Sequence, residues 1–204
     1  MTSIDHVTLE VDDPAAAEKF YAAIGLGERV RVRPGQAPSS GFRGYTLSVT
    51  VHQPAAVRHL VDAAVAAGAT VIKPATKSFW GFGGVVQAPD GAIWKVATSN
   101  KKDTDPADLT IDKVVLLVGA TDVAATKAFY VGQGLEVSKS YGRKYVEFAT
   151  PSSPVAFGLY GRKALAKDAG VPPEGDGSHR IAVTSDRGAF VDPDGFAWEA
   201  HGTR

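Results

Sequence analysis

Apolar and polar residues alternate over the first strand-length segment of the chain. In residues 4–11 (IDHVTLEV), Val7, Leu9 and Val11 fall on one face of an extended chain, and the residues between them fall on the other. This pattern predicts a half-buried strand. Apolar segments of similar length recur as TLSVTV, DKVVLLV and HRIAVTS, at residues 46–51, 112–118 and 179–185. The chain is therefore predicted to contain four segments that each open on a strand, which we call modules one to four.

A helical period follows three of these four strands. After the first strand, Asp13 fits an N-cap, apolar residues recur at spacings of three and four, and Gly25 can end the helix. A second amphipathic helix begins near Pro54, and a third follows Asp122 and includes Phe129. Turn residues and a closing hairpin follow the fourth strand instead. Modules two and three thus contain a strand, a helix and further strands, and modules one and four are truncated.

Two motifs occur twice in the same order. FYAAIGL and FYVGQGL occupy residues 20–26 and 129–135, and PDGAIWK and PDGFAWE occupy residues 89–95 and 193–199. Because both pairs keep their order and nearly the same separation, they predict a duplicated unit of roughly 100 residues. The stretch NKKDTDPAD separates the copies, which predicts two tandem domains, at 1–99 and 110–204, joined by a linker at 100–109. The closing motifs differ chemically at Lys95 and Glu199.

Composition excludes several classes of protein. The chain has 204 residues, of which 44% are hydrophobic and 22% charged, as is typical of globular domains. The 22 basic and 22 acidic residues form no long run of either sign, so nothing predicts a nucleic-acid or membrane partner. There is no cysteine, which excludes disulfides, thiolate metal sites and a cysteine nucleophile. Without a leader-like start or a transmembrane-length apolar run, we expect a cytoplasmic protein. The oligomeric state stays open, a dimer included.

Several of these features together resemble the vicinal oxygen chelate superfamily. They are the D-H-V opening strand, the helix that carries F-Y and ends in G-L, the helix that ends in A-A-G, and the closing P-D-G hairpin. That superfamily includes glyoxalase I, extradiol dioxygenases, fosfomycin-resistance transferases and bleomycin-binding proteins. The resemblance covers almost the whole chain. It implies an α+β fold of two tandem domains, whose βαβββ modules curl around concave pockets with the helices outside.

The resemblance also implies positions for metal ligands, on the first and last strands of each module. In the metalloenzymes these positions hold histidine on the first strand and glutamate four residues after the P-D-G glycine. Here the closing-strand position is Lys95 in module two and Glu199 in module four, and module one shows no closing strand. A lysine cation repels a divalent metal, so several positions fit poorly. The first-strand positions, from module one to module four, are His6, Tyr45, Lys113 and His179.

The choice of ligands depends on which modules share a pocket. If modules one and two pair, and three and four pair, neither pocket collects three good ligands; the short linkers within each half favour this arrangement. If module one pairs with four and two with three, His6, His179 and Glu199 converge. Two imidazoles and a carboxylate suit Zn, Ni, Fe or Mn, and Glu199 is then also a candidate for catalytic proton transfer. A strand histidine or glutamate is also compatible with an ordinary polar role.

Two classes of function follow. One is a glyoxalase-like enzyme, a lyase, isomerase or dioxygenase that acts on a small metabolite with a divalent metal. The other is a metal-free protein that binds or sequesters a small molecule, as bleomycin-resistance proteins do. The segment SFWGFGG leads into a strand and predicts a bent hairpin, or alternatively an aromatic wall for a flat ligand. The candidate pocket residues are Tyr45, Lys95, Lys113, Phe79, Trp80 and Phe82.

Overall fold

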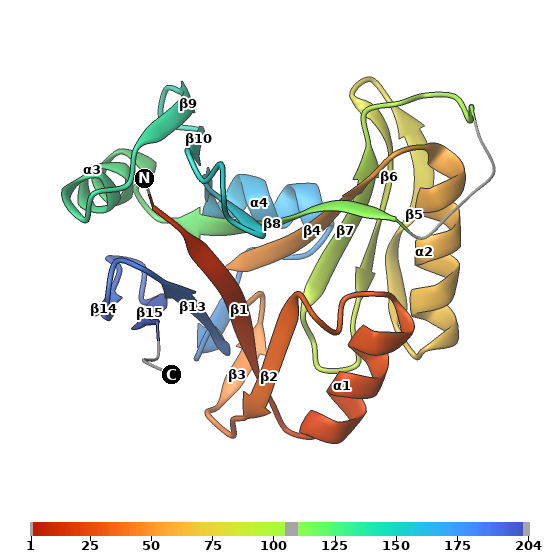
Figure 1. The fold of residues 1–204 in the computed structure, drawn as a ribbon, viewed down its shortest axis with the longest axis horizontal. Helices are drawn as coiled ribbons and strands as arrows, with labels where there is room; N and C mark the ends of the chain where they lie inside the picture. The colour runs from red at the N-terminus through yellow and green to blue at the C-terminus, as the bar shows by residue number, and fades with distance from the viewer. Residues whose placement is uncertain (1, 105–109, 202–204) are drawn as a thin grey trace.

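The structure is a computed structural model that describes residues 2–104 and 110–201. The predicted linker at 100–109 therefore lies partly outside the described residues, because 105–109 are not among them. The described chain contains four helices and fifteen strands in a mixed α+β arrangement (Figure 1). None of the described helices has the length and apolar character needed to cross a membrane.

The four predicted opening strands and the three predicted helices are present, and the structure adds a fourth helix, at residues 162–169, that was not predicted from the sequence. The first half contains β1 (Ile4–Val11), α1 (Pro14–Ala23), β2 (Val30–Pro34), β3 (Ser39–Gly41), β4 (Tyr45–Val51), α2 (Pro54–Ala66), β5 (Thr70–Ser78), β6 (Gly81–Gln87) and β7 (Ile93–Thr98). The second half contains β8 (Ile111–Ala120), α3 (Val123–Gly132), β9 (Val137–Tyr141), β10 (Tyr145–Phe148), β11 (Val155–Gly161), α4 (Arg162–Ala169), β12 (Gly175–Gly177), β13 (Ile181–Ser185), β14 (Phe190–Val191) and β15 (Ala197–Ala200).

The predicted helix boundaries of α1 and α3 are confirmed by their caps. The carboxylate of Asp13 accepts a hydrogen bond from the backbone N–H of Ala16, and Asp122 accepts from Ala124 and Ala125. These bonds satisfy N–H groups that have no partner inside the helix. Beyond α1, Gly25 adopts a positive φ of 73°, which glycine adopts at little cost.

The strands form two large sheets, each of which combines both halves of the chain. The eight-stranded sheet has the order β5-β6-β7-β4-β8-β11-β10-β9, and the five-stranded sheet has the order β14-β15-β13-β1-β2. Modules two and three therefore pair, as do modules one and four, and the expected preference for pairing within each half is wrong. Linker length was a poor guide because loop-closure entropy grows slowly with length. The linkers within the two halves even pair with each other, as β3 and β12.

Module one has a closing strand after all. In every module the closing strand runs parallel to the first strand: β7 to β4, β11 to β8 and β15 to β13. In module one this place is taken by β2, which pairs parallel to β1. The prediction that module one lacks this strand is wrong, because the short segment VRVRP carries no P-D-G hairpin to mark it.

The duplicated motifs form the same buried contact twice. The hydroxyl of Tyr21 on α1 donates to Asp90 at 2.7 Å and accepts from the indole N–H of Trp94 on β7 at 3.4 Å. In the second half, the corresponding contact joins the Tyr130 hydroxyl to Asp192 at 2.7 Å and to the indole N–H of Trp198 at 3.0 Å. The two repeated motifs thus dock a helix on a closing strand, and both tryptophans belong to the core, as predicted.

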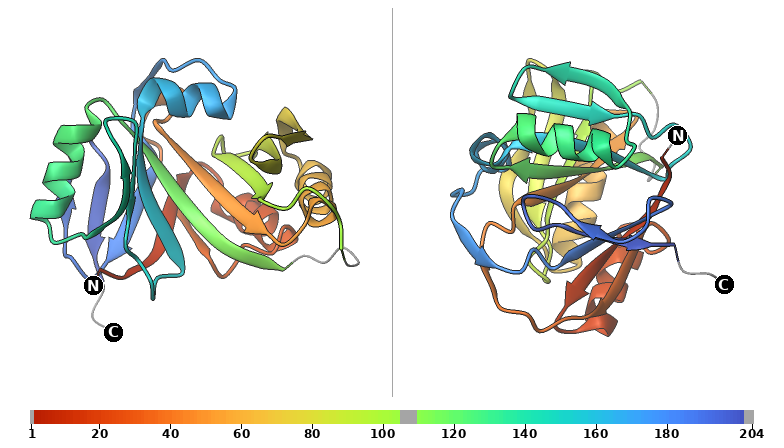
Figure 2. Two further views of the ribbon diagram at one scale, coloured as in Figure 1. Left: turned by 90° about the horizontal axis from the view of Figure 1, so that it is seen from above. Right: turned by 90° about the vertical axis from the view of Figure 1, so that its left-hand side faces the viewer.

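Helices cover both faces of the eight-stranded sheet. Leu116 of β8 belongs to the main core, into which α1, α2 and α3 pack, whereas its neighbour Leu117 contacts a smaller apolar cluster that includes Leu165 and Ala166 of α4. Because neighbouring residues of a strand point to opposite faces, α4 lies on the face away from the main core. Figure 1 shows α2 along β5, β6 and β7, and Figure 2 shows α4 at the other side of the sheet.

Candidate functional site

One face of the five-stranded sheet carries the predicted residues His6 and Glu199. Strand pairing places His6 opposite Thr184 and Thr184 opposite Glu199, so the three residues lie in one row across β1, β13 and β15. Residues in such a row point to the same face. The structure therefore brings His6 and Glu199 to one polar surface, which we call the five-stranded face.

The strand register identifies the four positions on this face where the superfamily pattern calls for ligands. Glu199 pairs with the first strand of its module at Thr184, and Arg33 on β2 pairs in the same way with Glu10 on β1. Arg33 is thus the counterpart of Glu199. On the first strands, His6 lies four residues before Glu10, and Arg180 lies four residues before Thr184. The counterpart of His6 is therefore Arg180, one residue away from the expected His179.

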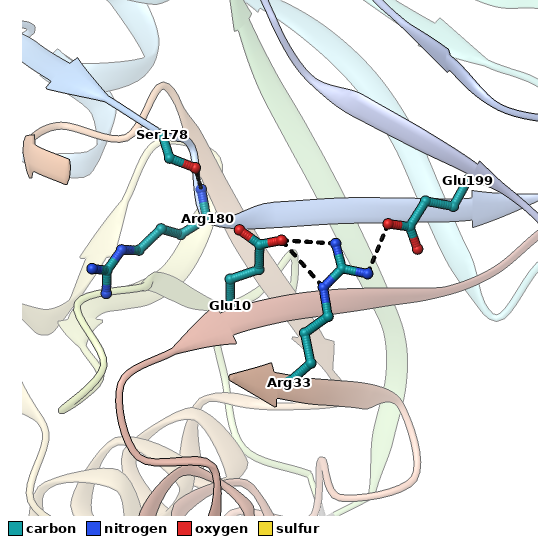
Figure 3. Close-up of polar contacts among 5 residues, drawn as sticks. All are labelled: Glu10, Arg33, Ser178, Arg180 and Glu199. Carbon is teal, nitrogen blue, oxygen red and sulfur yellow. Dashed lines mark hydrogen bonds and ion pairs between the residues drawn. The ribbon is translucent and has the colours of Figure 1, made fainter. Parts of the chain in front are cut away.

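Arg33 reaches from the edge strand β2 across the five-stranded face. Its Nη1 donates to Glu199 at 2.7 Å, and its Nε and Nη2 donate to one oxygen of Glu10 at 3.1 and 2.7 Å (Figure 3). Burial disfavours the charged form of Arg33, but the two carboxylates outweigh it and raise the pKa of the guanidinium further. A permanent cation therefore lies between the carboxylates that would otherwise attract a metal ion. The side chain of Arg180 points away from this cluster, toward Asp12 at 2.9 Å.

His6 lies in a setting that favours its neutral form. Burial lowers the pKa of the imidazole below its ordinary value of 6.5, and the charge of Arg31 lowers it further. Asp5 and Glu199 act in the opposite direction without reversing the shift. A neutral imidazole is what a metal ligand requires, so the electrostatic setting does not by itself disqualify His6.

His179 lies elsewhere. Its Nδ1 is 2.6 Å from the carbonyl oxygen of Arg43, its Nε2 is 2.9 Å from that of Asp194, and its ring stacks on Phe196 with centroids 3.8 Å apart. Within the described residues it shares no contact with His6 or Glu199. Both ring nitrogens face carbonyl oxygens, which only accept hydrogen bonds, so neither is presented to a metal. The expectation that His179 lies beside Glu199 is not met, because β13 begins two residues later, at Ile181.

The residues on the five-stranded face do not fit a divalent metal. Two of the four expected positions hold arginine, and the carboxylate of Glu199 is paired with one of them. Across residues 2–104 and 110–201, no group of three or more histidine, aspartate or glutamate side chains is placed to hold an ion. The ligand roles suggested for His6, His179 and Glu199, and the catalytic role of Glu199, thus remain predictions, and this donor set gives them little support.

The eight-stranded sheet offers still fewer ligands at the corresponding positions. Ser48 pairs with Lys95 as Thr184 pairs with Glu199, which places the first-strand position of module two at Gly44, one residue before the expected Tyr45. Tyr45 is buried in the core, where burial raises the pKa of its hydroxyl. Gly44 has a positive φ of 81°, and a Cβ there would collide with Nη1 of Arg162. Lys113 is exposed on β8.

A cavity of about 330 Å³ lies on the α4 side of this sheet, and we call it the α4-end cavity. Lys95 contributes its ammonium group, which pairs with Asp168 of α4 at 2.8 Å. Lys73 donates to the carbonyl oxygens of Lys167 and Asp168 at 3.0 and 2.6 Å. The cavity therefore holds two cations against one carboxylate. Of the predicted pocket candidates, it brings together Lys95, Trp80 and Phe82.

Trp80 gives this cavity an exposed aromatic wall. It lies at the turn between β5 and β6, its side chain is 83% exposed, and the neighbouring Phe79 packs against it edge to face at 5.0 Å. The predicted hairpin over SFWGFGG is thus confirmed. Phe82 lines the cavity but its ring also lies under the guanidinium of Arg58, at 5.4 Å. An exposed tryptophan beside lysines can stack on a planar ligand.

Sequence reasoning missed Arg33 and Asp168, which neutralise the charges that it did identify. Arg33 alternates with apolar residues in VRVRP, so a strand signal was present, although too short to separate from a loop. Asp168 lies in the sequence RKALAKDA, whose apolar residues repeat at helical spacing. Neither residue shows its partner in the sequence, because Glu199 and Lys95 are far away along the chain.

Comparison with solved structures identifies the fold. Glyoxalase I from Zea mays is similar over 98% of this chain and 92% of that chain, with a TM-score of 0.63 and 14% sequence identity. A putative dioxygenase from Bacillus subtilis subsp. subtilis str. 168 is similar over 97% of this chain and 84% of that chain, with a TM-score of 0.59 and 13% identity. No protein-family profile and no curated protein matches the sequence. The chain thus has the predicted vicinal oxygen chelate fold.

Proposed function

We propose that this protein binds a small, planar organic anion without a metal ion, in the α4-end cavity. The observation that carries the proposal is that Trp80, Lys73 and Lys95 line one cavity of about 330 Å³ on the α4 side of the sheet. That volume lies within the range of roughly 300–1,000 Å³ that is typical of small-molecule sites. The vicinal oxygen chelate fold supports the same function class, because that superfamily includes bleomycin-binding proteins, which bind a small molecule.

The charge of the lining selects the ligand class. The ammonium groups of Lys73 and Lys95 face a single carboxylate, Asp168, so the cavity has an excess of one positive charge. The ammonium group of Lys73 donates hydrogen bonds to backbone carbonyl oxygens, which carry no formal charge, so the positive charge of Lys73 stays uncompensated. A ligand with one negative charge, such as an aromatic carboxylate, would neutralise this excess while its ring stacks on Trp80.

The metal-dependent lyase, isomerase or dioxygenase is the weaker proposal. It requires several neutral or anionic ligands at one point, and Arg33 lies between the two carboxylates of the five-stranded face. On the eight-stranded sheet the corresponding positions are Gly44, Lys95, Lys113 and Gly158. Gly158 takes the closing-strand position of module three because it pairs with Leu117, four residues after Lys113. The fold is compatible with such chemistry, but the side chains at its usual positions favour binding without a metal.

Trp80 makes the proposal directly measurable. The chain contains three tryptophans, and Trp94 and Trp198 are 1% and 2% exposed, so a ligand in the cavity should quench mainly Trp80. We expect 1-naphthoate to quench the fluorescence saturably, and the neutral 2-naphthalenemethanol to bind at least about fivefold more weakly, which corresponds to about 1 kcal/mol.

The control is an exposed aromatic residue outside the cavity. Trp80→Ala should abolish saturable binding of 1-naphthoate measured by calorimetry, whereas Tyr141→Ala, which removes a ring that is 64% exposed on the β9–β10 hairpin, should leave it unchanged. If both variants bind as the unsubstituted protein does, or if that protein shows no saturable binding, the proposal is wrong.

A further inference from the structure

A second cavity, of about 570 Å³, lies at the opposite end of α4. It is bounded by the ends of β8 and β11, by the turn between β9 and β10, and by the first residues of α4. It shares no lining residue with the α4-end cavity. We call it the basic cavity because its lining includes Arg143, Lys144, Arg162 and Lys163 and no acidic residue.

The four cations come from two segments that the fold brings together. Arg143 and Lys144 lie on the β9–β10 turn, whereas Arg162 and Lys163 begin α4. The backbone joins the segments directly, because the N–H of Gly161 donates to the carbonyl oxygen of Lys144 at 3.2 Å. The concentration of positive charge is local, since the whole chain has equal numbers of basic and acidic residues.

Arg162 is held rigidly at the wall of the basic cavity. Its Nη2 donates to the carbonyl oxygen of Phe42 at 2.8 Å, its Nε donates to that of Pro173 at 3.2 Å, and its guanidinium lies 5.3 Å from the centre of the Phe42 ring. None of these groups carries a negative charge. Arg162 therefore contributes a fixed and uncompensated positive charge.

The other three cations have no partner in the described chain. The side chains of Arg143, Lys144 and Lys163 form no hydrogen bond or ion pair with residues 2–104 or 110–201, and all three are exposed. Elsewhere Arg33, Arg58 and Lys95 each pair with a carboxylate. Asp194 is not among the lining residues, although its carboxylate accepts a hydrogen bond at 2.7 Å from the backbone N–H of Thr121, which is.

Tyr160 adds an aromatic surface to the charged wall. It is partly exposed at the end of β11 and packs against Tyr145 with ring centroids 5.9 Å apart. Tyr145 in turn lies 6.1 Å from Tyr141, so the ring of Tyr160 is supported from one side. Ala164 lines the same cavity. The basic cavity thus offers both an apolar surface and a concentrated positive charge to one molecule.

We propose that the basic cavity binds a small organic molecule with a doubly charged anionic group, a phosphate monoester or a pair of carboxylates. One such group neutralises two of the four cations and accepts several hydrogen bonds from them, and its organic part packs on Tyr160. A monoanion leaves most of the charge uncompensated. This inference is independent of binding in the α4-end cavity.

Phenyl phosphate tests the proposal, because it joins a dianionic group to one aromatic ring. In calorimetry at pH 8 and low salt, we expect saturable binding to the unsubstituted protein, and binding at least about tenfold weaker for benzoate and for benzyl alcohol. Phthalate provides the dicarboxylate arm, and the tighter of phenyl phosphate and phthalate identifies the preferred group. Absence of saturable binding of both dianions, or equal affinity for benzyl alcohol, overturns the proposal.

Matched variants separate a local site from general charge attraction. Arg143→Gln combined with Lys163→Gln should weaken phenyl phosphate binding about tenfold or more. Lys19→Gln combined with Lys139→Gln also removes two positive charges, but at exposed positions outside the basic cavity. This control should change the affinity for phenyl phosphate by less than about twofold. Equal weakening by both pairs overturns the proposal. Circular dichroism of both double variants should match that of the unsubstituted protein, which checks that the fold is intact.

Discussion

Each sheet carries a charged residue at a closing-strand position, and that residue has a different neighbour on each sheet. On the five-stranded face, Arg33 and Glu199 bind each other, and both side chains stay more than a third exposed. On the eight-stranded sheet, Lys95 binds Asp168, which α4 brings to it. One fold therefore neutralises its charged closing-strand positions in two ways, by a second strand and by an added helix. The added helix has a cavity at each of its ends, the α4-end cavity and the basic cavity.

The two regions also differ in what stabilises them. In the ion pairs Arg33–Glu199 and Lys95–Asp168, the side chains are more than a third exposed. Solvent screening therefore limits the contribution of each pair to the free energy of unfolding to about 0–1 kcal/mol. The contact of α4 with the sheet is apolar, and Leu165 and Ala166 are fully buried there. Charge thus determines which ions each region admits, whereas apolar burial holds α4 in place.

The largest expected effect concerns the attachment of α4. Leu165→Ala removes a side chain with 0% exposure from the smaller apolar cluster, and we expect a loss of about 2–5 kcal/mol in the free energy of unfolding. Urea denaturation measures this loss. Val131→Ala, at an apolar helix position that is 48% exposed, should change the free energy by less than about 0.5 kcal/mol. Equal effects of the two substitutions would mean that α4 is not anchored by this contact.

The second prediction is that replacing Arg33 creates a metal site on the five-stranded face. Arg33→Glu removes the internal cation and places a carboxylate beside His6, Glu10 and Glu199, so Zn²⁺ or Ni²⁺ binding should tighten at least about 100-fold, or about 2.7 kcal/mol. Calorimetry against the unsubstituted protein measures the gain. Adding Glu199→Gln to this variant should remove most of it.

The matched substitution on the other sheet should not have this effect. Lys95→Glu makes the same change of charge, but Asp168 is then the one carboxylate beside it, because its register counterparts Gly44, Lys113 and Gly158 supply no ligand. Two carboxylates without a histidine are too few ligands to hold Zn²⁺ or Ni²⁺ tightly. We therefore expect no tightening of metal binding. A gain from Lys95→Glu equal to that from Arg33→Glu would show that net charge, and not the arrangement of His6 and Glu199, governs metal binding.

Much of this fold could be predicted from the sequence, because its signals are local. The alternation at Val7, Leu9 and Val11 and the cap at Asp13 depend on neighbouring residues, and both are confirmed. The pairing of modules could not be predicted this way, because the first strand of a module has the same local pattern whichever strand it joins. The ligand positions could not be predicted for a related reason. A shift of one residue in the strand register, from His179 to Arg180, changes the side chain at the expected ligand position.

A smaller effect tests the charge of the α4-end cavity. Asp168→Asn removes the only carboxylate among its lining residues, so 1-naphthoate should bind about two- to fivefold more tightly. Lys95→Gln should weaken binding by a similar factor. Fluorescence titration measures both, and Asp62→Asn on α2, outside the cavity, is the control. If Asp168→Asn weakens binding, Asp168 contacts the ligand directly and the assigned charge of the ligand is wrong.

The smallest effect is a dependence of stability on pH that originates at His6. Its pKa is lowered below 6.5 in the folded protein, mainly by burial, so the unfolded chain binds more protons as the pH falls. The contribution of His6 is fully present above pH 6.5 and is lost as the pH falls through its lowered pKa. His6→Gln should flatten this part of the profile by less than about 1 kcal/mol, as followed by urea denaturation from pH 7.5 to 5. An unchanged profile would contradict the assignment.

The most direct test of the central claim, that Arg33 takes the place of a metal ion, is the metal content of the purified protein. After exposure to Zn²⁺, Ni²⁺, Mn²⁺ and Fe²⁺ and dialysis, mass spectrometry should find less than about 0.1 equivalent of each, because a guanidinium between Glu10 and Glu199 excludes a second cation. About one equivalent of a divalent metal that survives dialysis, and that Glu199→Gln removes, would contradict the account.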